Sequence, residues 1–363
     1  MTAPAIPAQT SYFSRASVQT IVLGAFVFLT VPTVSLLMLW GEAVQPWLPL
    51  YGVTFGLTHF LITGLIYLDA RNLRYFASSW RNRLIYFGVP IAILVFMDAL
   101  AVVPMGQFGH DAHSFLFYFV MFVNFLHVSR QSFGVLQLFK RETTAKHSET
   151  LRSLENLFFI ALVLGQFMTF SGTGEYDAGS LEVKLVTGLT GLLFVLVFGT
   201  HVLALRKGAS RRADWIPVVH FTLQATSGAL VVWRSGLVDL SLAMHYVEYH
   251  VVMMPRVFDA PVERTSRADR TRALLSKVPL LFYAGLLMVA WGFWFAQRTE
   301  IYGNPEAASI PMRLLIHSLD GLFLFHFFIE AFIWKFSKPH YRDTLGPVYF
   351  APAVEREATL STD

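Results

Sequence analysis

Ten apolar runs, each about as long as a membrane span, constrain the fold of this 363-residue chain more than any other feature. A helix needs roughly 20 mainly apolar residues to cross a bilayer, since each residue advances it by about 1.5 Å. Only 14% of the residues are charged, whereas soluble domains carry about 25%. We therefore predict an all-α integral membrane bundle. The predicted spans are 18–40, 46–68, 83–103, 114–139, 154–171, 183–205, 215–234, 237–256, 278–297 and 310–336.

The distribution of basic residues tests this number of spans. If the N-terminus faces the cytoplasm and ten spans follow, 23 of the 28 Lys and Arg residues fall on the cytoplasmic side. The positive-inside rule predicts this asymmetry, which a missed or extra helix would destroy. We therefore predict ten transmembrane helices with both termini in the cytoplasm. They would form a single domain over residues 1–349, followed by a disordered cytoplasmic tail over 350–363.

Charge and cysteine usage exclude several classes of function. The net charge of +4 follows from the cytoplasmic anchors, so we expect the lipid bilayer as a partner and no nucleic acid. The chain has no cysteine, which excludes disulfides, iron–sulfur clusters and haem held by a thiolate. We expect an integral protein of a bacterial inner (cytoplasmic) membrane.

Eight of the twelve histidines fall inside the predicted spans. An ionisable side chain in the bilayer costs roughly 2.5–3.5 kcal/mol, so it should face a site or a partner. Imidazole clusters commonly bind metals such as iron or zinc. A lone intramembrane histidine more often bonds to a neighbouring helix, and His201, near the inner end of its span, fits that description. The candidate metal ligands are His59, His127, His220, His245, His250, His317 and His326.

Counting residues from the outer end of each span sorts these histidines by depth. Five fall in one layer roughly 5 Å thick: His59, His127, His220, His250 and His326. A second group would lie roughly 10 Å nearer the outer surface: His245, His317 and Asp320. This arithmetic predicts one main polar layer and a separate outer tier.

Acidic and aromatic partners accompany the histidines at helical spacing. His245, Glu248 and Tyr249 follow the i, i+3, i+4 pattern and share one face, and Glu330 lies one turn beyond His326. Such a carboxylate can bind the metal or accept the proton of a ligand's second ring nitrogen.

A mid-membrane arginine at position 130 requires a further partner, for which Glu248 and Glu330 are the candidates. The predicted catalytic or supporting residues are Glu248, Glu330, Arg130 and Tyr249.

Three stretches carry a resemblance to a known family. They are Thr-His59-Phe, His127-Val-Ser-Arg-Gln-Ser-Phe and the segment around His317 and Asp320. In this pattern the chain resembles the bacterial and archaeal Brp/Blh membrane family, whose members are similar to carotene-cleaving dioxygenases. The resemblance implies buried histidines that hold a non-haem iron and activate O2. The Pro-His-Gly-x-x-Asp and His-Phe-Gly motifs of that family are absent here, as are the histidine boxes of the membrane di-iron desaturases.

Three functions from different classes agree with these features. The first is a membrane iron oxygenase for a lipid-soluble substrate such as an isoprenoid or carotenoid. The sequence leaves open whether a partner protein supplies its electrons. The second is a haem protein that exchanges electrons with quinone through two axial histidines. The third is a proton-coupled transporter with an intramembrane relay. Zinc is an alternative to iron in the first function.

Overall fold

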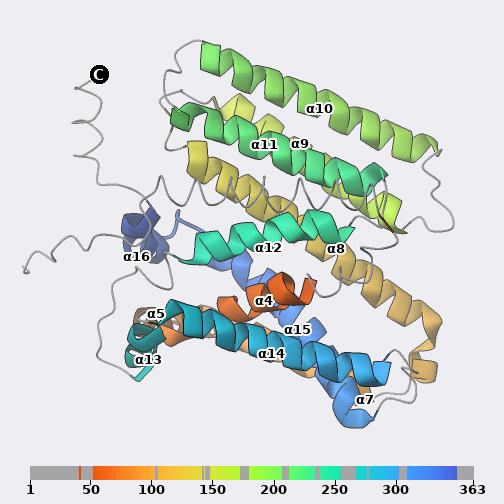
Figure 1. Cartoon of the computed structure of the whole chain (residues 1–363), viewed down its shortest axis with the longest axis vertical. Coiled ribbons are helices and arrows are strands. Elements are labelled where there is room, and N and C mark those ends of the chain that lie inside the picture. The colour runs from red at the N-terminus through yellow and green to blue at the C-terminus, as the bar shows by residue number, and fades with distance from the viewer. Residues whose placement is uncertain are drawn as a thin grey trace, which may run out of the picture. The chain divides into compact units, whose positions relative to one another are not determined.

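The computed structural model describes residues 41, 52–102, 105–140, 143, 148–171, 180–206, 212–233, 238–254, 267–275, 278–301 and 309–349. Every regular element within these ranges is helical (Figure 1). This agrees with the chemistry of apolar segments in a bilayer, where only a helix satisfies its backbone groups within one segment. The predicted span 18–40, both termini and the tail 350–363 lie outside the described residues.

Five helical stretches among the described residues are long and apolar enough to cross a membrane. They are Trp80–Leu100, Glu149–Ser171, Leu181–Arg206, Asp214–Val232 and Ile310–Ile333. A bent pair, Gly52–Leu68 with Ala70–Ala77, would be a sixth. These helices indicate an integral membrane protein, but the predicted number of ten is not reached in this part of the chain.

Three helices explain most of the shortfall. Helix α8 (Met105–Lys140) carries polar residues mid-length, helix α12 (Val238–Met254) has only 17 residues, and the apolar stretch of α14 (Pro279–Ile301) covers only Leu281–Phe295. Helix α8 also begins nine residues before the predicted start at 114. At about 1.5 Å per residue, its 36 residues exceed the roughly 30 Å hydrocarbon core.

Within the single domain predicted for residues 1–349, the described residues form two compact units, which divide at Val247 and Glu248 of α12. The first unit holds residues 57–102 and those from Glu248 onward. Its elements are the end of η3 (Gly52–Leu57), α4 (Thr58–Thr63), η4 (Gly64–Leu68), α5 (Ala70–Ala77), α6 (Trp80–Arg83), η5 (Leu84–Gly88), α7 (Val89–Val102), the end of α12, α13 (Arg267–Leu275), α14, α15 (Ile310–Ile333) and α16 (Pro339–Tyr349).

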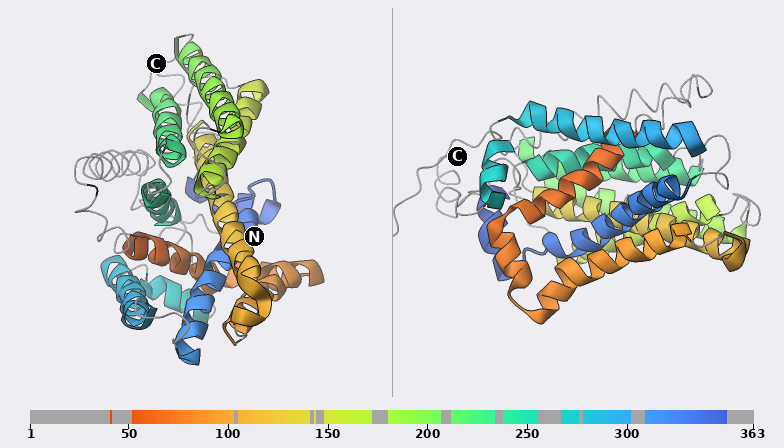
Figure 2. Two further views of the ribbon diagram at one scale, coloured as in Figure 1. Left: turned by 90° about the vertical axis from the view of Figure 1, so that its right-hand side faces the viewer. Right: turned by 90° about the horizontal axis from the view of Figure 1, so that it is seen from below.

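In the first unit, α7 packs along α15 (Figure 2). A Cβ atom on Gly321 of α15 would lie 3.1 Å from Leu94 Cδ2, so a larger residue there would require the Leu94 side chain to shift by a few tenths of an ångström. Buried aromatic and aliphatic side chains, among them Phe76, Tyr86 and Ile329, form the core of this unit.

A sharp bend sets the position of α4 in the first unit. The helical stretch Gly52–Leu68 ends at Asp69, and α5 leaves at 77° to it. Asp69 has an extended backbone, and its side chain accepts a hydrogen bond from the Arg71 backbone N–H at 2.9 Å. This N-cap satisfies an amide of α5 and so makes Asp69 the natural restart point of the helix.

The second unit holds α8, α9 (Glu149–Ser171), α10 (Leu181–Arg206), α11 (Arg212–Trp233) and α12 up to Val247. Helix α9 packs against α8, α10 and α11 (Figure 1). Gly228 of α11 lies against the Leu162 side chain of α9, where a Cβ atom would collide with it. Phe158, Phe159 and Phe221 are central to the apolar core.

Candidate metal centre

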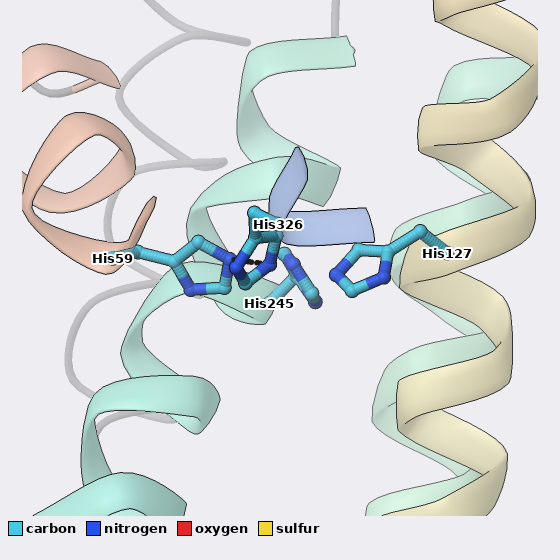
Figure 3. A group of neighbouring side chains, drawn as sticks. All are labelled: His59, His127, His245 and His326. Atoms are coloured by element: carbon cyan, nitrogen blue, oxygen red, sulfur yellow. Dashed lines mark hydrogen bonds between the residues drawn. The ribbon is translucent and has the colours of Figure 1, made fainter. Parts of the chain in front are cut away.

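The first unit brings two fully buried histidines into direct contact. His59 of α4 and His326 of α15 place their Nε2 atoms 2.8 Å apart (Figure 3). With metal–nitrogen bonds of about 2.1 Å, this separation would subtend about 84° at a shared metal ion, close to the right angle of an octahedral or square site. The pair therefore has the spacing of two neighbouring ligands.

The second nitrogen of His326 belongs to a chain of hydrogen bonds in the same unit. His326 Nδ1 lies 2.6 Å from Thr63 Oγ1, which lies 2.6 Å from the Tyr249 hydroxyl. Tyr249 donates to Glu330 Oε1 at 2.5 Å, and the Trp334 indole donates to Glu330 Oε2. We call Glu330, Tyr249, Thr63 and His326 the Glu330 relay.

Helical spacing explains why these side chains meet. Thr63 follows His59 by four residues on α4, so both point to the same side. Glu330 follows His326 by four residues, and Trp334 follows Glu330 by another four. Two helix faces thus supply the histidine pair and most of the relay, and Tyr249 of α12 completes it.

Aromatic rings cover the histidine pair within this unit. The Phe60 ring centroid lies 4.9 Å from that of His59 and 4.9 Å from that of His326. The Phe323 ring packs against Phe60 at a tilt of 34°, with the centroids 4.2 Å apart. This apolar cover keeps bulk water from the Nε2 atoms and strengthens the polar contacts beneath it.

The second unit contains its own buried histidine pair. His127 of α8 and His245 of α12 have perpendicular rings with centroids 5.0 Å apart, and one ring nitrogen of each lies within 4.8 Å of one of the other (Figure 3). Gln131 lies one turn beyond His127, and its buried amide makes no hydrogen bond to the described residues. That amide retains its capacity to bind water or a substrate.

Helix α12 runs through both units without a break. It carries His245 one turn before Tyr249, whose ring centroid lies 4.2 Å from that of His59. Each buried pair, His59 with His326 and His127 with His245, supplies two imidazoles that could serve as metal ligands within its own unit. Neutral imidazoles suit iron, zinc, copper or nickel, so the donor set fits a transition metal without selecting one.

Three other predicted metal ligands belong to neither of these two histidine pairs. His250 lies one residue beyond Tyr249, and its Nε2 lies 3.1 Å from the Thr58 hydroxyl. His220 of α11 packs edge-on against Phe139, with centroids 5.1 Å apart. His317 lies nine residues before His326 on α15 and is only partly buried.

The sequence predicted that His245 would lie roughly 10 Å from the layer that contains His127. This prediction is wrong, because the two rings are 5.0 Å apart within the second unit. The depth arithmetic treated every helix as starting at one level and running parallel to its neighbours. Helix α8 begins earlier, at Met105, but a count from there would place His127 still deeper, so the start of α8 does not explain the pairing.

The predicted carboxylate partner of Arg130 is also replaced. Arg130 is exposed, its Nη1 donates to Asn156 Oδ1 of α9, and its guanidinium lies 5.3 Å from the Phe133 ring centroid. The structure thus gives Arg130 an amide of the neighbouring helix as its partner, in place of the predicted carboxylate. Glu248 is fully buried on α12, as expected of a carboxylate that faces a site or a partner.

A second polar cluster, which the sequence interpretation missed, lies in the second unit. Glu155 of α9 is fully buried, and its oxygens accept from Lys140 Nζ at 2.9 and 2.8 Å and from Gln137 Nε2 at 2.8 Å. His201 Nε2 of α10 lies 2.9 Å from Glu155 Oε1, which confirms the helix–helix role predicted for His201. The signal was available: Glu155 is an isolated carboxylate near the start of an apolar run.

His340 lies beyond the predicted last span, in α16 of the first unit. Its ring stacks on Tyr75 with a centroid distance of 4.0 Å, and its Nε2 lies 3.1 Å from Asn72 Oδ1. Helix α16 therefore extends the ordered structure beyond the predicted last span.

Comparison with known proteins adds no relative. No protein-family model, no curated protein and no solved structure matches this chain.

Proposed function

We propose that this chain is a membrane-embedded, histidine-ligated metalloenzyme, and specifically a non-haem iron oxygenase that acts on a lipid-soluble substrate such as an isoprenoid. The observation that carries the proposal is the 2.8 Å contact between the buried Nε2 atoms of His59 and His326. The other ring nitrogen of His326 is hydrogen-bonded through the Glu330 relay to a buried carboxylate. A ligand histidine whose second nitrogen is bonded in this way is typical of metal sites.

The choice of iron and oxygen rests on the donor set. Buried imidazoles without a thiolate suit a redox metal that keeps coordination positions for O2, and a bound iron would supply the one-electron steps that O2 activation needs. The Brp/Blh-like pattern around His59 and His127 agrees with this chemistry. Zinc satisfies the same donors without redox activity, so the metal must be measured.

The protein's own residues would hold the site dry and oriented. Phe60 and Phe323 cover the histidine pair of the first unit, which shields reactive species from water. The unpartnered Gln131 amide beside His127 would orient a polar group of the substrate. Apolar spans provide access for a substrate that dissolves in lipid, and electrons would come from a partner protein.

Metal analysis of purified protein tests this proposal. After expression with added iron and purification in detergent, we expect close to one iron per chain. His59→Ala and His326→Ala should reduce iron to less than a tenth of an equivalent, whereas His340→Ala, which removes a histidine outside both pairs, should retain it. Full iron content in the His59 and His326 variants, or none in the wild type, would overturn the proposal. Zinc in place of iron would retain the site and reject the oxygenase.

The number and orientation of the membrane spans form the second part of this proposal. We infer that the bent pair, α8, α12 and α14 also cross the bilayer. With the predicted span 18–40, which lies outside the described residues, these make ten spans with both termini in the cytoplasm of a bacterial inner membrane. The alternation of basic residues supports this arrangement. A reporter that works only in the cytoplasm should be active when fused after residue 145 or 260. A reporter that works only outside the cytoplasm should be active when fused after residue 175. Any reversed fusion would require a different number of spans.

A further inference from the structure

The Thr63 hydroxyl occupies a decisive place in the Glu330 relay. It lies 2.6 Å from two atoms, the Tyr249 oxygen and His326 Nδ1. A hydroxyl has one hydrogen to donate, so Thr63 can donate to one of these partners and must accept from the other. Whether Thr63 donates its hydrogen to Tyr249 or to His326 therefore decides which nitrogen of a neutral His326 carries the ring hydrogen.

The other end of the relay sets that direction. The indole of Trp334 can only donate, and it donates to one oxygen of Glu330, while Tyr249 donates its hydroxyl hydrogen to the other. The Tyr249 oxygen is then an acceptor, and Thr63 supplies the hydrogen between them. With its hydrogen used there, Thr63 can only accept from His326, which must carry a hydrogen on Nδ1.

We propose that Thr63, Tyr249 and Glu330 are positioning residues that hold His326 in the Nδ1–H tautomer and leave the lone pair on Nε2. This assignment is a property of the metal-free protein. It also makes His59 the donor across the 2.8 Å contact, since one of the two Nε2 atoms must carry the hydrogen between them. The use of the His326 lone pair as a metal ligand rests on the proposed function.

The opposite proton arrangement makes the proposal falsifiable. If Glu330 carried a proton toward Tyr249, every bond of the relay would reverse, and Thr63 would donate to His326 Nδ1. His326 would then carry its hydrogen on Nε2 and donate it to His59 across the 2.8 Å contact. The two arrangements differ in an observable quantity, the 15N chemical shifts of the His326 ring.

The experiment is 15N NMR of histidine-labelled, metal-free protein in detergent, with His326→Gln to assign the signal. We expect the Nδ1–H pattern in the wild type and in Thr63→Ser, which keeps the hydroxyl. Tyr249→Phe frees the Thr63 hydrogen to turn to Nδ1, so we expect the Nε2–H pattern in it. In Thr63→Val, which removes the acceptor, we expect loss of the Nδ1–H preference. Thr58→Val is the matched control: it removes a buried hydroxyl of the same helix that contacts His250, and it should leave the His326 signal unchanged.

Affinity for Fe²⁺, measured by chelator competition, gives the second readout. We expect Thr63→Val to bind Fe²⁺ about 10–100-fold more weakly and Thr58→Val to match the wild type. An Nε2–H pattern in the wild type, or an unchanged pattern in both Tyr249→Phe and Thr63→Val, would overturn the relay. If the tautomers shift as expected but the wild type binds no iron, the relay stands and the proposed function fails.

Discussion

Two buried carboxylates on apolar helices, one in each unit, differ in what surrounds them. Glu155 is held by the Lys140 ammonium, the Gln137 amide and His201, so a positive charge balances it directly. Glu330 accepts hydrogen bonds from a tyrosine and a tryptophan, both uncharged, and lies one turn from a histidine in contact with another. The same residue type thus occurs once in an ion pair and once at the end of a relay.

The surroundings of a buried carboxylate indicate whether it stabilises the fold or supports a ligand site. A carboxylate whose charge and oxygens are matched by neighbouring helices joins those helices and has little left to offer a ligand. A carboxylate held by neutral donors transmits its preference along the hydrogen bonds toward the histidine. We therefore expect substitutions at Glu155 to change stability and those at Glu330 to change metal binding.

The largest effect should come from Glu155→Ala. It leaves the Lys140 ammonium buried without its partner, so we expect the free energy of unfolding to fall by about 3–5 kcal/mol. Denaturant unfolding in detergent micelles measures this loss. Glu149→Ala is the control, because that exposed carboxylate makes only a surface pair with Arg152 at 3.7 Å. Iron per folded chain should not change, and a specific loss of iron would abolish the distinction between the carboxylates.

Glu330→Gln should have the next largest effect, on metal affinity and not on stability. Its amide nitrogen must face either Tyr249 or Trp334, both of which donate to Glu330, so the relay loses its acceptor at one oxygen. We expect the affinity for Fe²⁺, measured by competition with a chelator, to fall about 10–100-fold. Asp343→Asn, an exposed acid of the same unit, should bind as the wild type does. Unchanged affinity in Glu330→Gln would make Glu330 a second structural carboxylate.

Gln137→Ala sharpens the description of the Glu155 cluster. It removes one neutral donor while Lys140 and His201 remain, so we expect a loss of about 1 kcal/mol in the free energy of unfolding. A loss as large as that of Glu155→Ala would mean that the amide, and not the charge of Lys140, stabilises the carboxylate.

Arg130→Ala should have the smallest effect. This side chain is exposed and contacts only Asn156 and Phe133 among the described residues, so we expect a change within about 0.5 kcal/mol and unaltered iron content. A loss of iron in Arg130→Ala would restore the catalytic role that the sequence suggested for this residue.

The helices were largely predictable from the sequence, because the length of an apolar run directly limits the length of a buried helix. The ends of α9, α10, α11, α12, α14 and α15 lie within about five residues of the predicted ones, whereas α13 and α16 were not predicted. Helix α8 was misjudged at its start, where polar residues continue the helix beyond the apolar run. The bend at Asp69 was also missed, because the extended backbone there depends on local capping and not on hydrophobicity.

The candidate site was predictable in its residue types and only partly in its contacts. His59 and His326 were expected in one layer, and the structure places them in contact. His245 was misplaced, since depth along one helix says nothing about the tilt or start of the next. The link from Thr63 through Tyr249 joins three helices distant in sequence, so no spacing within one segment could reveal it.

The pairing of Lys140 with Glu155 bears on how the chain enters the bilayer. Lys140 ends α8 and Glu155 lies early in α9, so two consecutive helices each bring one charge to the same contact. Inserted singly, each would carry an unmatched charge at a cost of a few kcal/mol, whereas inserted together the two charges form a neutral ion pair. We expect the hairpin of α8 and α9 to be the unit of insertion during synthesis. Lys140 then contributes little to orientation, which Arg141, Lys146 and Arg152 must set.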